Sequence, residues 1–432
     1  MIAAEVKYKK TGIDWMPEVP EHWEIVRLKN VTKVVSGATP KSSVSANWDG
    51  NINWVTPAEF GDEMFIGESV RKITKTGLQS CAAALVPIGS IILSNRAPIG
   101  SLGISKVELC TNQGCKSIIP TQINNYFLYF LMTLQKENLN VLGNGTTFRE
   151  LATPSLRNYK IPFPPREEQD KIASHLYDEN EKITHFIQTK QRFIELLKEQ
   201  RQSIITNAVT KGIDEKAKLK ETVLGEIPEH WEVRRLGTIG RFSKGGNISR
   251  SELIYTDEGV PAILYGDIYT KYDIVAENII NRITKETAAK SVELKKGDLL
   301  FTGSGETKED IGKCVIFNSD EPAYAGGDVI IFKQDIFDSY FISYSQNSSI
   351  AKYQKATSSK GEIIVHTYGS KLRDVIMPYP PTIEEQKQIV EHIKAETKTL
   401  DIAISKAERE IELIKEYREA MIAEAVTGKM KL

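Results

Sequence analysis

The sequence is poor in cysteine, in long apolar runs and in excess charge of either sign. Four cysteines among 432 residues are too few for a disulfide-stabilised scaffold. No apolar run approaches the roughly 18 residues that a membrane span requires, and the first residues lack the apolar stretch of a signal peptide. Lys and Arg number 56 against 57 Asp and Glu, which excludes a uniformly basic surface but not a local basic patch. We therefore expect a soluble, cytoplasmic protein, and its length predicts two or more domains.

The sequence also lacks the motifs that would identify an enzyme. It contains no Walker loop, no Gly-x-Ser-x-Gly elbow, no His-Glu-x-x-His and no cysteine pairs at the spacing of a zinc site. Two weak patterns exist. Phe301-Thr-Gly-Ser-Gly305 is similar to the glycine-rich loop that binds S-adenosylmethionine, and Asp273 with Glu293 and Lys295 has the residue types of a metal-dependent nuclease. A self-contained methyltransferase or nuclease is therefore the alternative hypothesis, and a binding protein without a catalytic site is the leading one.

What the sequence does contain is an internal duplication. Pro20-Glu-His-Trp-Glu24 recurs 208 residues later as Pro228-Glu-His-Trp-Glu232. Near the end of each copy, Ile161-Pro-Phe-Pro-Pro165 recurs as Met377-Pro-Tyr-Pro-Pro381, and each is followed by Glu-Glu-Gln. A period above 200 residues is too long for a solenoid repeat and indicates a duplicated domain. His22 and His230 recur with their tryptophans, which predicts a packing corner in each copy.

Each copy has a globular part and a helical part. Short apolar runs between turn residues, such as those ending at Leu93 and Phe301, predict strands, and 125–132 reads as a short buried helix. The segments 166–211 and 383–427 are charged, almost free of Gly and Pro, and apolar at spacings of three and four. They predict two long amphipathic helices that bury their stripes against each other. The predicted seam residues are Ile172, Leu176, Ile183, Phe186, Phe193, Leu197, Ile204, Ile389, Ile393, Leu400, Ile414 and Met421.

These motifs, in this order and in two copies, resemble the specificity subunit of type I restriction-modification systems. The resemblance rests on the Pro-Glu-His-Trp-Glu opening, the strand at 297–302, the Pro-Tyr-Pro-Pro helix entry and the helix at 411–418, and it covers essentially the whole chain. It implies an α+β fold in which two similar globular α/β target-recognition domains alternate with two long helices that pair as an antiparallel coiled coil, a pseudo-two-fold repeat. By this resemblance the recognition domains are 1–164 and 215–380, and the helical regions are 165–214 and 381–432.

The resemblance also implies the partners. A specificity subunit binds double-stranded DNA, joins two methyltransferase subunits and optionally two restriction (translocase) subunits, and has no catalytic site of its own. No cofactor is therefore expected in this chain, and S-adenosylmethionine, ATP and Mg²⁺ are expected on the partner subunits. The two domains differ in sequence, so we expect an asymmetric, bipartite target. The recognition subunit of another multisubunit restriction system is a related alternative.

Base readout needs Arg, Lys, Asn, Gln, Ser or Thr at base edges, and phosphate contacts need cations or backbone N–H groups. Loops after the matched strands supply such residues in both domains. The candidates are Lys41, Ser42, Asn95, Arg96, Asn144, Thr146, Thr147 and Arg149 in the first domain, and Lys244, Asn247, Arg250, Thr302, Ser304, Lys360 and His366 in the second.

Overall fold

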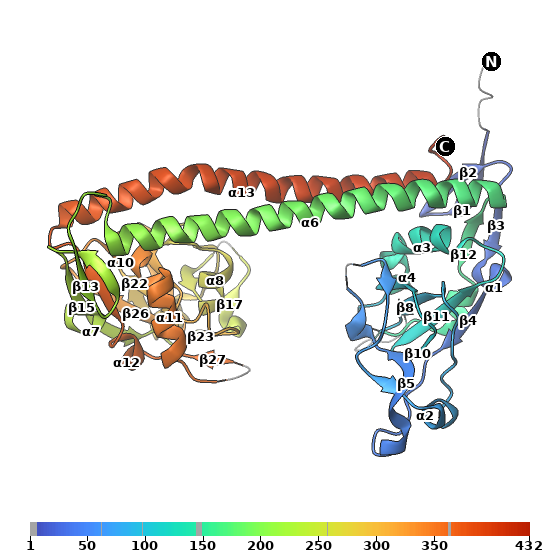
Figure 1. Ribbon diagram of the computed structural model, residues 1–432, viewed down its shortest axis with the longest axis horizontal. Helices are drawn as coiled ribbons and strands as arrows, with labels where there is room; N and C mark the ends of the chain where they lie inside the picture. Colours follow the sequence, from blue (N-terminus) through green and yellow to red (C-terminus); the bar gives the residue numbers. More distant parts are fainter. Residues whose placement is uncertain (1–6, 62, 97, 144–148, 257, 362–363) are drawn as a thin grey trace. The chain divides into compact units, whose positions relative to one another are not determined.

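The computed structural model describes residues 7–61, 63–96, 98–143, 149–256, 258–361 and 364–432. The chain forms two compact units (Figure 1): unit 1 consists of Met1–Lys190 and Arg409–Leu432, and unit 2 of Gln191–Glu408. Each unit holds one globular part and one segment of each of two long helices, α6 (Arg166–Lys211) and α13 (Ile383–Val426). No helix in the described ranges combines the length and apolar character needed to cross a bilayer.

The globular part of unit 1 is built on a five-stranded sheet with the strand order β4-β11-β8-β9-β6. Its strands are β4 (Thr32–Ser36), β6 (Phe65–Ile66), β8 (Ile91–Ser94), β9 (Leu102–Ser105) and β11 (Cys115–Pro120). A second sheet has the order β10-β5-β7, from β10 (Leu109–Thr111), β5 (Trp48–Val55) and β7 (Lys72–Ile73). All four residues of β8 are buried, as expected for a central strand of a covered sheet.

Among the described residues, two strand pairs and five short α-helices complete the globular part of unit 1. Two antiparallel pairs lie near the ends of the globular part: β1 (Tyr8–Ile13) with β2 (Met16–Pro20), and β3 (Glu24–Arg27) with β12 (Lys160–Phe163). The α-helices are α1 (Leu28–Val31), α2 (Lys75–Gln79), α3 (Asn125–Thr133), α4 (Lys136–Val141) and α5 (Thr153–Arg157). The predicted buried helix at 125–132 is thus confirmed as α3, whose first N–H groups are capped by the Asn124 side chain.

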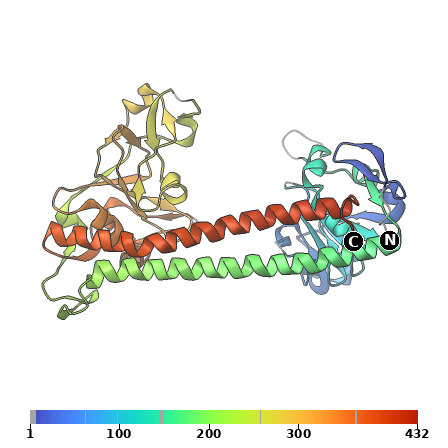
Figure 2. The ribbon, with the colours of Figure 1, turned by 90° about the horizontal axis from the view of Figure 1, so that it is seen from above.

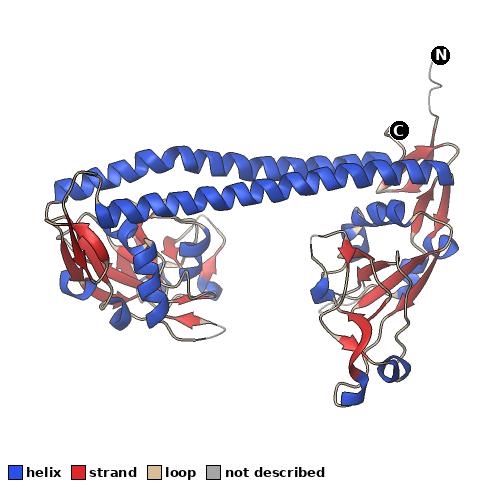
Figure 3. Ribbon diagram, in the orientation of Figure 1, coloured by secondary structure: helices blue, strands red, loops and turns tan. Residues whose placement is uncertain are grey.

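Unit 2 repeats this plan with a five-stranded sheet of order β16-β26-β22-β24-β19. These strands are β16 (Arg241–Lys244), β19 (Val275–Ala276), β22 (Leu299–Thr302), β24 (Cys314–Phe317) and β26 (Val329–Lys333). The second sheet is larger, with the order β17-β20-β18-β25-β21 from β17 (Leu253–Ile254), β18 (Val260–Ile263), β20 (Arg282–Ile283), β21 (Val292–Leu294) and β25 (Ala323–Ala325). Figure 3 shows these strands beneath the helix segments of their own unit.

Three two-stranded pairs and several short helices complete unit 2. The pairs are β13 (Leu219–Thr222) with β14 (Gly225–Pro228), β15 (Glu232–Arg235) with β28 (Ile376–Tyr379), and β23 (Ser304–Gly305) with β27 (Val365–His366). The helices are α7 (Leu236–Ile239), α8 (Tyr265–Thr270), α9 (Lys285–Ala288), α10 (Ser339–Gln346), α11 (Ser349–Ser358) and α12 (Gly369–Leu372). The duplication predicted from the sequence is therefore confirmed. The additional residues of the second copy lie after its central strand, because the offset between equivalent strands is 208 residues at β8 and β22 but 212 residues at β9 and β24.

The recurring Pro-Glu-His-Trp-Glu motif fastens each globular part to the start of its helix. In unit 1, Glu168 Oε2 accepts a hydrogen bond of 2.8 Å from Trp23 Nε1, and Oε1 lies 2.8 Å from His22 Nε2. In unit 2, Glu385 Oε1 accepts 2.9 Å from Trp231 Nε1 and lies 3.0 Å from His230 Nε2. The predicted packing corner is thus confirmed in both copies, and its partner is the second glutamate of the Glu-Glu-Gln entry.

The glutamine of the same entry is buried and joins two more segments. Gln169 Nε2 donates 2.8 Å to Pro164 O, and its Oε1 accepts 2.8 Å from the backbone N–H of Asn124, which caps α3. Gln386 makes the equivalent bonds in unit 2, to the carbonyl at 380 and the backbone N–H at 338. One short motif therefore fixes both the long helix and a short core helix.

The far ends of the long helices return to the other copy's tryptophan. Gly212 and Gly428 follow α6 and α13 with φ of +74° each, which confirms them as the predicted helix stops. A Cβ on Gly212 would lie 3.3 Å from Trp231, and one on Gly428 would lie 2.5 Å from Pro20 and 3.0 Å from Trp23. The end of α6 therefore belongs to unit 2 and the end of α13 to unit 1.

The two helices run antiparallel within each unit (Figure 2). In unit 1, Lys190 Nζ lies 2.6 Å from Glu410 Oε2. In unit 2, Lys198 Nζ lies 3.3 Å from Glu408 Oε1, and Arg201 Nε donates 2.7 Å to Asp401 Oδ1. The position on α13 falls as the position on α6 rises, which confirms the antiparallel coiled coil that the resemblance implied.

The buried stripe of α6 differs from the predicted seam at two positions. Phe186 and Phe193 are 37% and 44% exposed, whereas Ile187 and Ile194 are 8% and 7% exposed. Their assignment to the seam is wrong because successive residues on an α-helix are rotated by about 100°, so a shift of one position turns a side chain away from the partner helix. Of the other predicted seam residues, Ile172, Leu176, Ile183, Ile389, Ile393 and Met421 are buried, and Leu197, Ile204, Leu400 and Ile414 are half-buried.

Both helices also close the core of the globular part. In unit 2, the cluster around Trp231, Leu299 and Phe341 includes Ile205 of α6 and Ile389 of α13. Burying a large aliphatic side chain contributes about 1.5–3 kcal/mol. The globular part of unit 2 is thus stabilised by the helix segments of its own unit.

The cysteines behave as core residues. Cys110, Cys115 and Cys314 are buried, and burial raises the pKa of each of these thiols to about 12. Burial therefore favours the protonated form of these three thiols.

Candidate nucleic-acid interface

Four of the predicted DNA-contacting residues lie at one equivalent place in each unit, just beyond the end of the central strand of the five-stranded sheet: Asn95 and Arg96 in unit 1, and Ser304 and His366 in unit 2. In unit 1, Arg96 pairs with Glu150 in an antiparallel bridge, and Leu151 N donates 2.9 Å to Asn95 O. In unit 2, Ser304 pairs with His366, and the backbone N–H at 367 donates 2.9 Å to the carbonyl at 303. The offsets are those of the sequence repeat, 208 and 216. We call these places edge 1 (Asn95, Arg96, Lys116, Glu150) and edge 2 (Lys244, Ser304, His366, Thr367).

Edge 1 carries an ion pair. Arg96 donates from Nε at 3.2 Å and from one terminal nitrogen at 3.0 Å to Glu150 Oε2. Asn95 Nδ2 donates 3.2 Å to the other carboxylate oxygen of Glu150. Lys116 Nζ donates 3.0 Å to Ser36 Oγ, and burial lowers the pKa of this lysine. The half-exposed Arg96 guanidinium is therefore held in one orientation and keeps free N–H groups.

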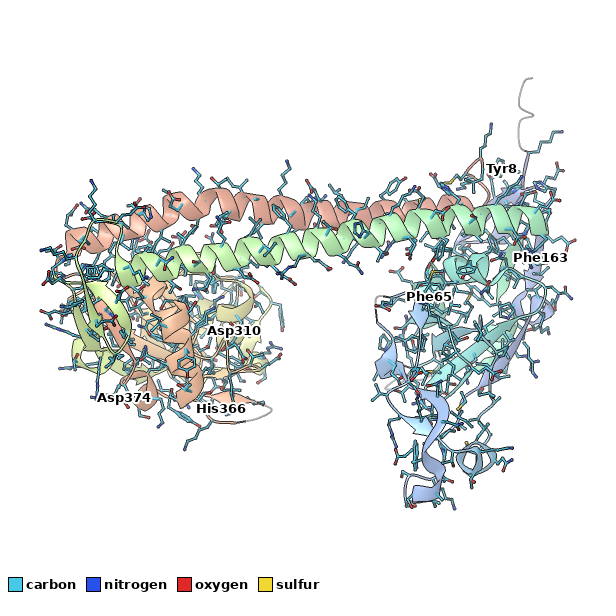
Figure 4. All side chains as sticks on the ribbon, viewed as in Figure 1. Tyr8, Phe65, Phe163, Asp310, His366 and Asp374 are labelled. Atoms are coloured by element: carbon cyan, nitrogen blue, oxygen red, sulfur yellow. The ribbon has the colours of Figure 1, made fainter. Side chains whose placement is uncertain are left out.

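Edge 2 carries a hydrogen-bonded serine–histidine pair beside a cavity. Ser304 Oγ lies 2.9 Å from His366 Nδ1, and His366 exchanges both backbone hydrogen bonds with Lys360. Figure 4 shows His366 on the side of unit 2 remote from its helix segments. The adjoining cavity has a volume of about 310 Å³ and is lined by Phe242, Lys244, Ser304, Asp328, Ile330, His366, Thr367, Tyr368 and Arg373, among others.

Several predicted residues lie elsewhere. Lys41, Ser42 and Asn247 are exposed on other loops, and Arg250 is exposed at the start of a short 3-10 helix (Arg250–Glu252). Within the described ranges no hydrogen bond or ion pair joins their side chains to either edge. Arg149 is exposed next to Glu150. Asn144, Thr146 and Thr147 lie outside the described residues.

Two predicted residues are fully buried. Thr302 is 0% exposed and donates 2.7 Å to Tyr269 Oη, so the prediction that it contacts DNA is wrong. Its position in the central strand turns its side chain into the core. Asn95 is also 0% exposed, but its side chain belongs to edge 1 through Glu150.

Three residues of the edges were not predicted from the sequence: Lys116, which lies within strand β11, and the loop residues Glu150 and Thr367. An acidic residue or a threonine in a loop does not by itself indicate a DNA-contacting position when each copy of the repeat is considered alone. The repeat indicates such a position, because Glu150 occupies the position of His366 at the offset of 216 residues. A position-by-position comparison of the two copies would have identified it.

The patterns behind the alternative enzymatic hypothesis have structural roles. The glycines at 303 and 305 lie in and beside strands, and a Cβ on Gly305 would come within 2.6 Å of Tyr269 Oη. Asp273 is paired with Arg201, and Glu293 lies on β21 opposite Tyr324. In the ranges that the structure describes, no three His, Cys, Asp or Glu side chains are grouped to hold a metal ion.

A second kind of cavity lies where each globular part meets its helix segments. The unit 2 cavity measures about 210 Å³ and is lined by Arg201 and Asp273, which form an ion pair across it. The unit 1 cavity measures about 880 Å³ and is lined by Glu63 and Arg418, the repeat-related residues. Among the described residues, no carboxylate lies within ion-pair distance of Arg418. Arg201 therefore forms an ion pair in unit 2 that has no counterpart at Arg418 among the described residues of unit 1.

The helix pair offers repeat-related apolar residues on its outer surface. Leu196 on α6 and Leu413 on α13 occupy the same position in the two copies, and each is 47% exposed. Their neighbours Ile194 and Ile411 are buried in the seam, so each leucine points to another side of its helix. Each copy thus presents the same exposed leucine.

Comparison with known proteins shows what this arrangement is similar to. The family model described as the type I restriction modification DNA specificity domain matches twice, at residues 20–206 and 228–413. The specificity subunit of the type I restriction enzyme MjaIX of Methanocaldococcus jannaschii is 27% identical over 99% of this chain and 97% of its own length. The MjaVIII specificity subunit of the same organism is 25% identical over 96% and 94%. A solved chain from work on complex assembly and conformational transition of the type I R-M system has a TM-score of 0.67 at 15% identity, over 95% of this chain and 99% of its own.

Proposed function

The chain belongs to the family of type I restriction modification DNA specificity domains, and on this premise we propose that its two globular parts read two different halves of one asymmetric DNA target. The observation that carries the proposal is the pair of equivalent edges with different chemistry. Edge 1 presents an arginine held by a carboxylate, and edge 2 presents a serine–histidine pair beside a cavity. Because the backbone frame is the same and the side chains differ, the two domains present different donors and acceptors to DNA.

The chain acts in this proposal as a non-catalytic subunit. S-adenosylmethionine, ATP and Mg²⁺ are bound by the partner subunits, and this chain supplies sequence recognition and assembly. The test of this part is incubation of the purified chain with duplex DNA, S-adenosylmethionine and Mg²⁺. Methyl transfer or cleavage by the chain alone would contradict it.

The helix pair docks the partners. We assign one methyltransferase subunit to each copy, with Leu196 and Leu413 as repeat-related contacts, and restriction subunits join through this complex. Two identical partners need two equivalent surfaces, and the internal repeat supplies them. An exposed leucine that enters an apolar pocket of a partner loses that contact when it is replaced by a charged residue.

An exchange experiment tests the recognition proposal. Residues 1–160 are replaced by the corresponding residues of another specificity subunit, and methylated sites are mapped by sequencing in a host that carries the complete system. We expect one half of the methylated sequence to change and the other half to stay. A change in both halves, or in neither, would refute the assignment of one half-site to each globular part.

Docking is tested separately by co-purification with the methyltransferase subunit. Leu196→Glu and Leu413→Glu are each expected to reduce the bound methyltransferase from two copies to one, and the double variant to abolish binding. Lys415→Glu is the matched control, because it also changes charge on an exposed residue and lies about 200° around the helix from Leu413. Normal binding by the double variant would contradict the assigned surface.

A further inference from the structure

Buried polar side-chain atoms without a partner mark both edges. Among the described residues, only three such atoms are found: Asn95 Oδ1, Gln346 Oε1 and Thr367 Oγ1. Asn95 is 0% exposed and Thr367 is 2% exposed. A buried polar atom without a hydrogen bond is costly, so it is rare unless another molecule completes its bonding. Two of the three atoms lie on edges that the repeat makes equivalent.

Thr367, the residue that carries the unpartnered hydroxyl of edge 2, is among the residues that line a cavity of suitable size and composition. The cavity of about 310 Å³ falls at the lower end of the range for small-ligand sites. Its wall combines apolar surface from Phe242 and Tyr368 with donors from Lys244 and Thr367 and an acceptor at Asp328. Such a wall suits a flat, polar-edged group such as a nucleobase.

His366 adds a second group to the same cavity. Its Nδ1 is occupied by Ser304 at 2.9 Å, which fixes the plane of the ring. The other ring nitrogen, Nε2, has no hydrogen-bond partner among the described residues. This nitrogen donates or accepts according to the tautomer, and the serine hydroxyl adapts by rotating.

Edge 1 differs from edge 2 in that its exposed polar group is the guanidinium of Arg96. Arg96 uses one N–H on Nε and one on a terminal nitrogen to bind Glu150. A guanidinium has five N–H groups, so three remain free, in one fixed plane. Arginine that is held in a plane is suited to the two acceptors, O6 and N7, on the major-groove edge of guanine.

We propose that the two edges are the base-reading positions of the two domains: Arg96, oriented by Glu150, contacts a guanine, and Thr367 with His366 contacts a base edge that enters the cavity of unit 2. This inference rests on the proposed function of DNA reading and names the residues that carry it. A base edge fits edge 1 better than a phosphate does, because the Glu150 carboxylate already neutralises the Arg96 guanidinium. The cavity of edge 2 is lined by Lys244 and Arg373 as well as by Asp328, so the salt dependence of binding distinguishes the two ligands there.

The experiment selects binding sequences from a library of random-sequence duplexes, using the full chain assembled with its methyltransferase subunits. The parent complex is compared with Arg96→Ala and Thr367→Val. Arg166→Ala is the control for the first, since Arg166 is also an exposed arginine paired with a carboxylate. Thr357→Val is the control for the second, since Thr357 is an exposed threonine on α11 of the same unit.

We expect Arg96→Ala to weaken the preference at a guanine in one half-site by about 10- to 100-fold, and Thr367→Val to change a position in the other half-site only. Thr367→Val should leave the thermal unfolding midpoint unchanged or raised, since the hydroxyl that it removes has no partner. The two control variants should enrich the parent sequence. A folded Thr367→Val complex with altered preference would support the inference independently of Arg96.

Three results would overturn it. If the variants enrich the same sequence as the parent, the edges do not read bases. If they weaken all sequences equally and reduce the salt dependence, they contact phosphates. If the parent complex enriches no sequence at all, the proposed function fails, and this inference fails with it.

Discussion

Replacing Glu385 by alanine tests whether the recurring motif fastens the globular part of unit 2 to its helix. Glu385 Oε1 accepts the indole N–H of Trp231 at 2.9 Å and lies 3.0 Å from His230 Nε2. Trp231 is 0% exposed, so water does not replace the lost acceptor in an unchanged structure. The variant therefore leaves a buried donor unpaired.

The expected cost is the sum of two effects. A buried donor that loses its acceptor costs about 1–3 kcal/mol. Removing a carboxylate from the first turn of α13 costs a further 0.3–1 kcal/mol or so, because it is attracted to the positive end of the helix dipole. We expect Glu385→Ala to lower the free energy of unfolding of unit 2 by about 1–4 kcal/mol. Glu385→Gln should cost less, since its amide oxygen still accepts from Trp231.

The assay is urea unfolding followed by circular dichroism, with hydrogen–deuterium exchange measured on peptides that cover 228–236 and 383–390. Faster exchange confined to these peptides would locate the loss at the predicted contact. Glu168→Ala makes the mirror measurement in unit 1, where Glu168 accepts from Trp23 at 2.8 Å.

Glu391→Ala is the matched control, because Glu391 lies on the same helix, is 73% exposed and pairs with the exposed Lys394. Such a surface pair contributes at most about 1 kcal/mol. If Glu385→Ala destabilises the protein no more than Glu391→Ala does, the motif does not fasten the helix as described.

Three further predictions concern stability. Arg201→Met should destabilise unit 2 by about 1–2 kcal/mol in urea unfolding, because Arg201 is 19% exposed and binds both Asp273 and Asp401. An equal loss of stability in Arg418→Met, the repeat-related variant, would contradict the role of these ion pairs. Burial lowers the pKa of the Lys355 ammonium from 10.5 to about 8, so the unfolded state binds more protons than the folded state between about pH 8 and 10.5. The free energy of unfolding should therefore rise with pH over this window, by up to about 3 kcal/mol from this group. Lys355→Met should remove that rise when unfolding is followed at several pH values. Gly428→Ala should lower the thermal unfolding midpoint more than Gly212→Ala does. Both glycines have a left-handed backbone, but only a Cβ on Gly428 would come within 2.5 Å of another residue, Pro20. The reverse order of midpoints would be inconsistent with this packing.

The long helices show how far local patterns can be read. Their bounds follow from proline before the first turn, glycine after the last and a continuous apolar period, and α6 begins and ends where the pattern predicts. The local pattern predicts less accurately which individual residues face the partner helix. Phe186 and Phe193 fit a seven-residue repeat as well as Ile187 and Ile194 do, and only the position of the partner helix separates the two sets.

The candidate interface shows a different limit. Arg96, Ser304 and His366 were found from loop position and residue type, and Thr302 was included for the same reasons although its side chain points into the core. The partner of Arg96 is 54 residues away and reaches it only through strand pairing. Long-range pairing of this kind leaves no trace in the local sequence.

The sequence by itself determined the duplication, the alternation of globular parts with helices, the strand cores and the family that the chain resembles, because each of these depends on local periodicity and on motifs that recur at a fixed offset. The tertiary structure alone decided which helix face is buried, that Glu168 and Glu385 bind the recurring His-Trp pairs, and that Glu150 and Thr367 stand at equivalent edges. These features depend on which residues, distant in the chain, are brought within hydrogen-bond distance, and that is set by the packing of the whole unit.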